Sequence, residues 1–180
     1  TTNIIAALTK KLKLNVAAAK LTGIAAQKDI IAMNNAGAKE VISFLDIGIC
    51  STINHHGLVV PAAKTLLNKL SCNNPDVIVV ELGDGIIGWY GVDKLLNDDE
   101  FANTVRFNVM CAHDLVGAKG AFDMLNKLNI KIDFFAGPVT NNTAGTDYLE
   151  HILKVPSGDL RHDTSKLLKI IKTKGVIKYD

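Results

Sequence analysis

Acidic and glycine residues at the end of one apolar segment are the part of this sequence best suited to chemistry. Four β-branched residues, 77–80, lead into Glu81, and Asp84 follows between two glycines, Gly83 and Gly85. An unbroken apolar run of this kind is typical of a strand in the middle of a parallel sheet with helices on both faces. In such sheets, ligands bind beyond the carboxyl ends of the strands. We therefore expect Glu81 and Asp84 to lie at the mouth of a binding site.

Strand-like and helix-like segments alternate along the whole chain, which predicts how these acids are positioned. This alternation indicates an α/β fold with three layers, in which a mostly parallel sheet has helices on both faces. The 180 residues, 48% of them hydrophobic, are enough for one sizeable core and predict a single domain over 1–180. Besides the strand at 76–80, we expect strands at 15–19, 41–45, 107–111 and 132–136, and helices near 4–13, 28–36, 59–70, 93–96, 100–105, 116–128, 144–153 and 164–172.

The composition excludes several classes of partner. With 20 basic and 18 acidic residues the net charge is +2, which indicates neither a nucleic-acid nor a membrane surface. Cys50, Cys72 and Cys111 are widely spaced and form no C-x-x-C pair, so the sequence predicts neither a disulfide framework nor a zinc site. The sequence has no apolar run of membrane-spanning length and no signal-peptide pattern. We expect a cytoplasmic protein.

The first two residues, Thr1 and Thr2, precede an amphipathic helical pattern, and no initiator methionine stands before them. In a phosphate-binding loop, G-x-x-x-x-G-K-[ST], the hydroxyl residue begins a helix whose amides hold phosphate, and its oxygen binds magnesium. Thr1 and Thr2 are what would remain if such a sequence were cut directly after its Gly-Lys. An ordinary helix N-cap at an arbitrary boundary is the simpler explanation of these two residues taken alone.

The order of segments resembles the dethiobiotin synthetase group of P-loop proteins, which also includes cobyrinate amidases and the molybdopterin-guanine dinucleotide biosynthesis adaptor. P-loop proteins similar to that group have segments much like AAAKLTG, NAGAKEVISFLDIG, VVELGDGIIG and MCAHDLVGAKG, and the likeness extends from Thr1 to about Leu153. The resemblance implies a P-loop NTPase fold whose first strand and phosphate loop lie upstream of Thr1. It also implies ATP or GTP with Mg²⁺, a small-molecule substrate and, as is common in the group, a homodimer.

The resemblance also implies roles for individual residues. Thr1 matches the magnesium-binding hydroxyl, and Asp29 and Glu81 match the two acidic magnesium ligands. Lys20 matches the lysine of a K-x-x-T-G segment that lines the substrate and phosphate site, although K-L-T-G here is one residue shorter. Leu82, which follows Glu81, is a departure from the V-V-E-G-x-G-G pattern. The implied nucleotide-binding residues are Thr1, Thr2, Thr22, Gly23, Gly137, Pro138 and Asn141.

Chemistry gives these positions a reason of its own. Magnesium prefers hard oxygen ligands and keeps waters and phosphates in its shell, so one hydroxyl and two carboxylates are sufficient. A lysine that faces the phosphates stabilises the charge of phosphoryl transfer. Lys20 is therefore one catalytic candidate. Asp84, at the mouth of the expected site, is the other. Lys20 and Asp29 could equally be solvated surface residues, and Asp84 could equally cap a turn.

Gly137, Pro138 and Asn141 follow the predicted strand at 132–136, where related proteins place the nucleotide base. An asparagine amide offers both a donor and an acceptor to a purine edge. Turn formation explains the same residues equally well.

Three functions remain open from the sequence. The first is Mg²⁺-dependent transfer of phosphate from ATP or GTP to a small acceptor such as a carboxylate, and the second is a nucleotide-binding adaptor without turnover. The third is a methyltransferase, because 81–85 also fits an E-x-G-x-G loop for S-adenosylmethionine. That loop normally follows the first strand of a larger sheet, so the strand order disfavours it. The 180 residues alone should bind nucleotide poorly, since they lack the loop amides and lysine.

Overall fold

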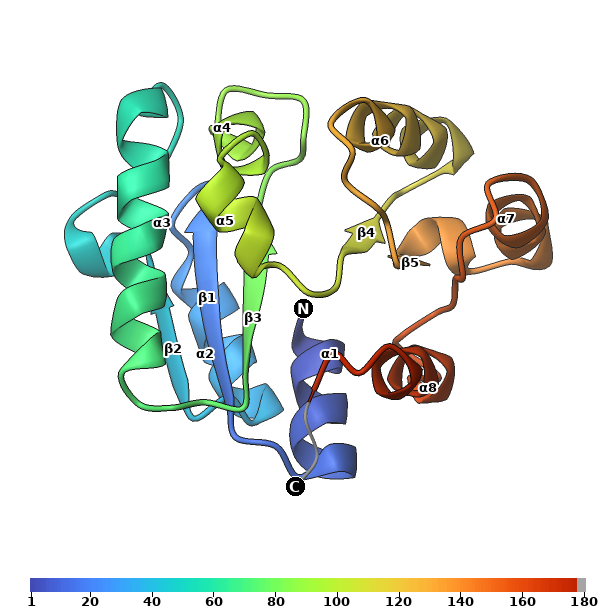
Figure 1. Cartoon of the computed structure of the whole chain (residues 1–180), viewed down its shortest axis with the longest axis horizontal. Coiled ribbons are helices and arrows are strands. Elements are labelled where there is room, and N and C mark those ends of the chain that lie inside the picture. The colour runs from blue at the N-terminus through green and yellow to red at the C-terminus, as the bar shows by residue number, and fades with distance from the viewer. Residues whose placement is uncertain (178–180) are drawn as a thin grey trace. The chain divides into compact units, whose positions relative to one another are not determined.

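The computed structural model describes residues 1–177, apart from the side chain of His56. The fold is α/β, with small parallel sheets and helices around them (Figure 1). The chain divides into two compact units, residues 1–104 and 105–180. Within the described residues, no helix has both the length and the apolar character needed to cross a membrane.

A three-stranded parallel sheet organises the first unit. Its strands are β1 (Val16–Thr22), β2 (Glu40–Ser43) and β3 (Val77–Leu82), in the order β2-β1-β3. β1 is buried along its whole length, whereas every residue of β3 is only half-buried. The sequence predicted that the apolar run of β3 would be central. Among the described residues β1 is the central strand instead, and one edge of β3 has no partner strand.

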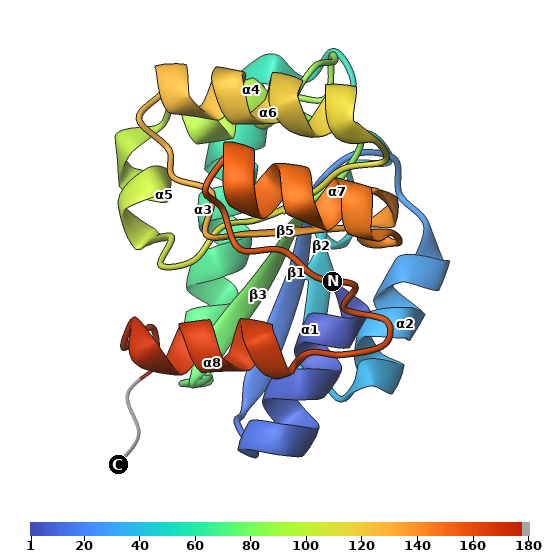
Figure 2. The same cartoon turned by 90° about the vertical axis from the view of Figure 1, so that its right-hand side faces the viewer.

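Helices cover both faces of this sheet. In both views α3 (His56–Ser71) lies on one face, and α1 (Thr2–Ala6) and α2 (Gln27–Ala36) lie on the other (Figures 1 and 2). α1 continues as a π-helix, Ala7–Lys11, and the unit also contains a 3-10 helix, Phe44–Ile47, with α4 (Val92–Leu96) and α5 (Asp99–Thr104).

The buried apolar cluster shows which side chains of β1 point toward α3 and which point to the opposite face of the sheet. Alternate residues of β1, namely Ala17, Ala19 and Leu21, share a buried cluster with residues of α3 such as Leu66. Successive side chains of a strand point to opposite faces. Lys20 therefore faces the side of the sheet that α1 and α2 cover.

The second unit is built on a parallel pair, β4 (Val109–Cys111) and β5 (Phe134–Ala136). The Asp133 carboxylate joins separate segments of this unit, because it accepts one hydrogen bond from the backbone amide of Asn108 and another from the ammonium of Lys174. The remaining elements are α6 (Leu115–Lys127), a 3-10 helix (Pro138–Thr140), α7 (Thr143–Asp147) with a following π-helix (Tyr148–Ile152), and α8 (Ser165–Thr173). All five predicted strands therefore occur, with shifted ends.

Candidate functional site

Two charged side chains stand next to each other near the carboxyl ends of β1 and β3. Lys20 and Glu81 are partners in the parallel register of these strands. Neighbouring strands lie about 4.8 Å apart, and residues in register point to the same face. Glu81 therefore shares with Lys20 the face that α1 and α2 cover, which brings a cation and an anion together beside two helix N-termini.

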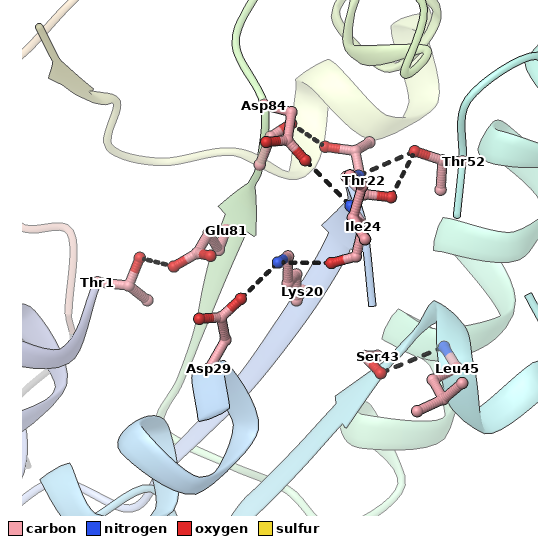
Figure 3. Close-up of polar contacts among 12 residues, drawn as sticks. Thr1, Lys20, Thr22, Ile24, Asp29, Ser43, Leu45, Thr52, Glu81 and Asp84 are labelled. Carbon is pink, nitrogen blue, oxygen red and sulfur yellow. Dashed lines mark hydrogen bonds and ion pairs between the residues drawn. The ribbon is translucent and has the colours of Figure 1, made fainter. Parts of the chain in front are cut away.

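Thr1 reaches this pair from the start of α1. Its hydroxyl donates a hydrogen bond to Oε2 of Glu81, across 80 residues of sequence (Figure 3). Both residues are half-buried. The structure thus brings together Thr1 and Glu81, two of the three residues expected to bind magnesium.

Asp29 reaches the pair from the first turn of α2. Its Oδ2 lies 2.5 Å from Nζ of Lys20, which also donates to the backbone oxygen of Ile24 at 3.0 Å (Figure 3). Lys20 is only 6% exposed, so its ammonium needs these partners. Asp29 stabilises a buried cation and also fits the first turn of a helix, where acids are favourable.

Hydrogen bonds join the carboxyl end of β1 and the loop that follows it to the glycine loop after β3, next to these charged side chains. Oδ2 of Asp84 accepts the amide of Ile24 at 3.0 Å, and the hydroxyl of Thr22 donates to the backbone oxygen of Gly83 at 3.0 Å. A Cβ at Gly83 would lie 2.8 Å from the backbone oxygen of Thr22. One at Gly23, where φ is +111°, would lie 2.5 Å from Oδ2 of Asp84. Both loops therefore need glycine for their close approach.

Thr52 is a residue of this site that sequence reasoning missed. It is 1% exposed, and its Oγ1 accepts the amide of Gly23 at 2.9 Å, while its own amide donates to the Gly23 oxygen at 3.0 Å. These bonds attach the loop after β2 to the loop after β1 (Figure 3). A hydroxyl residue within a glycine-containing loop was the only signal, and it does not reveal burial.

Other predicted nucleotide-binding residues have structural roles of their own. Thr2 lies in the first turn of α1. Gly137 has a φ of +94°, and a Cβ there would lie 2.7 Å from a backbone oxygen. Pro138 begins the following 3-10 helix.

Asn141 ends that 3-10 helix in the second unit. Its side-chain oxygen accepts a hydrogen bond from Nη2 of Arg161 at 2.7 Å. A nucleotide base at this position would therefore meet an Asn141 oxygen that already accepts a hydrogen bond. Hydrogen bonds from the same Arg161 lower the pKa of the Asp159 carboxyl to about 2. Asn141 thus belongs to a charged surface cluster with Arg161 and Asp159.

The donors at the first unit fit magnesium by their chemistry. One hydroxyl, from Thr1, and two carboxylates, from Asp29 and Glu81, are hard oxygen ligands of the kind Mg²⁺ takes alongside water and phosphate. In residues 1–177 no group of three or more His, Cys, Asp or Glu side chains is gathered as a metal site. One hydroxyl and two carboxylates would leave the other positions of an octahedral Mg²⁺ shell to water and phosphate oxygens.

Comparison with known proteins adds no assignment. No protein-family model matches the chain, and no curated protein sequence matches it. A functional conclusion therefore depends on the site itself.

Proposed function

We propose that this chain is part of a P-loop NTPase, in which Thr1, Asp29 and Glu81 bind Mg²⁺ and Lys20 contacts the phosphates of ATP or GTP. The observation that supports this best is the pairing of Lys20 with Glu81 across β1 and β3, with Thr1 bonded to Glu81 and Asp29 to Lys20. Hydroxyl, carboxylate and ammonium groups from β1, β3 and the starts of α1 and α2 meet near the carboxyl ends of the parallel strands, the edge of a sheet where α/β proteins bind ligands.

The sheet of the first unit is compatible with this fold. Among the described residues the outer edge of β3 has no partner, although residues 77–80 are all β-branched. Native proteins rarely leave such an apolar edge uncovered. The proposal assigns this edge to a further parallel strand, which leads through the phosphate loop to Thr1.

Each side chain has a task in phosphoryl transfer. Two hydrogens of the Lys20 ammonium bond to Asp29 and Ile24, which leaves the third for a phosphate oxygen. Its positive charge stabilises the negative charge that develops on the transferred group. The Mg²⁺ ion, when bound, supplies further neutralisation of the phosphate oxygens. Asp29 holds Lys20 in place, and Glu81 orients the Thr1 hydroxyl.

Residues 1–180 contain no G-x-x-x-x-G-K motif. The proposal therefore requires that motif directly before Thr1, because its amides and lysine hold the phosphates. Reading the gene at this point is the first test, and an unrelated sequence there would refute the P-loop fold.

Calorimetry of the complete gene product with Mg²⁺ and ATP or GTP is the second test. Glu81→Gln should weaken binding of the Mg²⁺-nucleotide about tenfold or more, in line with the usual effect of disturbing a metal site. Glu40→Gln makes the same change at the amino end of β2, away from the site, and should leave binding unchanged. Absence of binding to both nucleotides, or equal effects of the two substitutions, would overturn the proposal.

A further inference from the structure

Exposed apolar side chains of the first unit gather at the same edge of the sheet as the charged site. Of the large apolar residues that are exposed within 1–104, Ile31 lies on α2 and Leu58 on α3. The others lie on the loops and the 3-10 helix that follow the carboxyl ends of β1, β2 and β3. Ile24 is 54% exposed, Ile53 is 41% exposed and Trp89 is 69% exposed. A concentration of this kind indicates a surface that binds something apolar.

The loops that present these side chains are held together by hydrogen bonds. The amide of Asn54, next to Ile53, donates to the backbone oxygen of Trp89 at 3.1 Å, which joins the loops after β2 and β3. The amide of Ile24 donates to Asp84, and the backbone oxygen of Ile24 accepts Lys20. Ile24 therefore connects the apolar surface directly with the charged site.

The charges at this edge decide which end group an apolar ligand can bring. In the proposed complex Mg²⁺ offsets the negative charges of its ligands Asp29 and Glu81, so the carboxylate of Asp84 is the group that faces a second ligand. Oδ2 of Asp84 accepts the amide of Ile24, and no hydrogen bond from a described residue reaches its Oδ1. The like charge of Asp84 would repel a carboxylate placed beside Oδ1, whereas a hydroxyl group could donate a hydrogen bond to this oxygen.

We propose that the acceptor of the phosphoryl group is an alcohol with an apolar body, which lies over Ile24, Ile53 and Trp89. This inference rests on the proposed function, and it replaces the carboxylate acceptor that the sequence suggested. The alcohol oxygen forms a bond to the γ-phosphorus as its proton passes to Oδ1 of Asp84. The bond between the γ-phosphorus and the bridging oxygen breaks, and its electron pair leaves with the nucleoside diphosphate. Asp84 thus acts as the general base.

Trp89 is the only tryptophan of the chain, so its fluorescence reports on this surface without nucleotide. We expect 1-hexanol to give a saturable change at concentrations at least about tenfold lower than hexanoate, which has the same chain length. Ile24→Ser should weaken hexanol binding. Ile31→Ser changes an isoleucine that is also 54% exposed, but on α2, and should have no effect. Equal binding of hexanoate, no saturable change, or equal effects of the two variants would overturn the inference.

Phosphorus NMR of the complete gene product with Mg²⁺-nucleotide and hexanol tests the transfer step. Asp84→Asn keeps an acceptor for the Ile24 amide and tolerates the φ of +65° at this position, but removes the base. It should lower the rate of hexyl phosphate formation about a hundredfold or more while nucleotide binding persists. An unchanged rate would overturn the role of Asp84. Nucleotide binding without hexanol binding would refute this inference alone, and hexanol binding without nucleotide binding would refute the proposed function.

Discussion

Replacing Thr52 by valine tests whether its buried hydroxyl holds the loops of the site together. Valine has the same shape, so the change removes the acceptor of the Gly23 amide without opening a cavity. That amide is buried, and its bond to Oγ1 is 2.9 Å long. A buried donor left unsatisfied costs about 1–3 kcal/mol, and the hydroxyl's own contact with the Gly23 oxygen, at 3.5 Å, adds little. We expect a loss of about 2 kcal/mol, roughly a thirtyfold shift in the folding equilibrium.

Urea unfolding followed by Trp89 fluorescence measures this loss, because Trp89 lies in the first unit. Hydrogen exchange at the Gly23 amide should accelerate in parallel. Thr52→Ser keeps the hydroxyl and should keep that amide protected. Thr65→Val is a matched control on the exposed side of α3, where the hydroxyl donates to the oxygen of Pro61, and it should change stability by less than about 0.5 kcal/mol. The reasoning is refuted if Thr52→Val lowers the free energy of unfolding by less than about 0.5 kcal/mol. It is also refuted if the Gly23 amide exchanges no faster in this variant than in the unsubstituted protein.

Four further outcomes are expected. Gly83→Ala should destabilise the first unit by about 1–3 kcal/mol in the same urea assay, because its Cβ would lie 2.8 Å from a backbone oxygen. Gly145→Ala should destabilise the second unit at least as much in thermal unfolding followed by circular dichroism, since a backbone oxygen lies only 1.8 Å from the added Cβ. Gly120→Ala should stabilise its helix by about 0.5–1 kcal/mol, because a Cβ at this position has no atom within 4 Å. Equal losses of stability in Gly145→Ala and Gly120→Ala would contradict this expectation. The Asp159 carboxyl should titrate by NMR at a pKa of about 2, and Arg161→Gln should return this pKa toward 3.8. Because its folded pKa is depressed, Asp159 stabilises the folded state above pH 3.8 and loses this contribution as the pH falls through about 2, and a pKa unchanged by the substitution would exclude Arg161 as the cause.

The fold class was accessible from local patterns in the sequence. Apolar runs such as 77–80 and amphipathic stretches such as 116–128 set strands and helices through their own periodicity. The exact extent of each element was less accessible. β1 continues to Thr22, beyond the predicted end at residue 19, because Lys20 pairs with both β2 and β3 and Thr22 still pairs with Leu82 of β3.

Tertiary contacts changed the roles assigned to individual residues of the site. Asp84 appeared from the sequence as a turn residue or a catalyst, and the structure makes its Oδ2 the acceptor that joins the loops after β1 and β3. Thr52 was not a candidate at all. A threonine in a loop looks the same in sequence whether its hydroxyl meets water or a buried amide, and only packing distinguishes the two environments.

What the sequence determined by itself was the chemistry on offer: an acid at the end of an apolar strand, a lysine at the end of another, and glycines in the loops that follow. Tertiary structure decided which of these groups meet. Lys20 and Glu81 are 61 residues apart, and they become neighbours only because β1 and β3 pair in parallel with this register. Local propensity cannot specify such a pairing, because register depends on which apolar faces are buried together over long sequence separations.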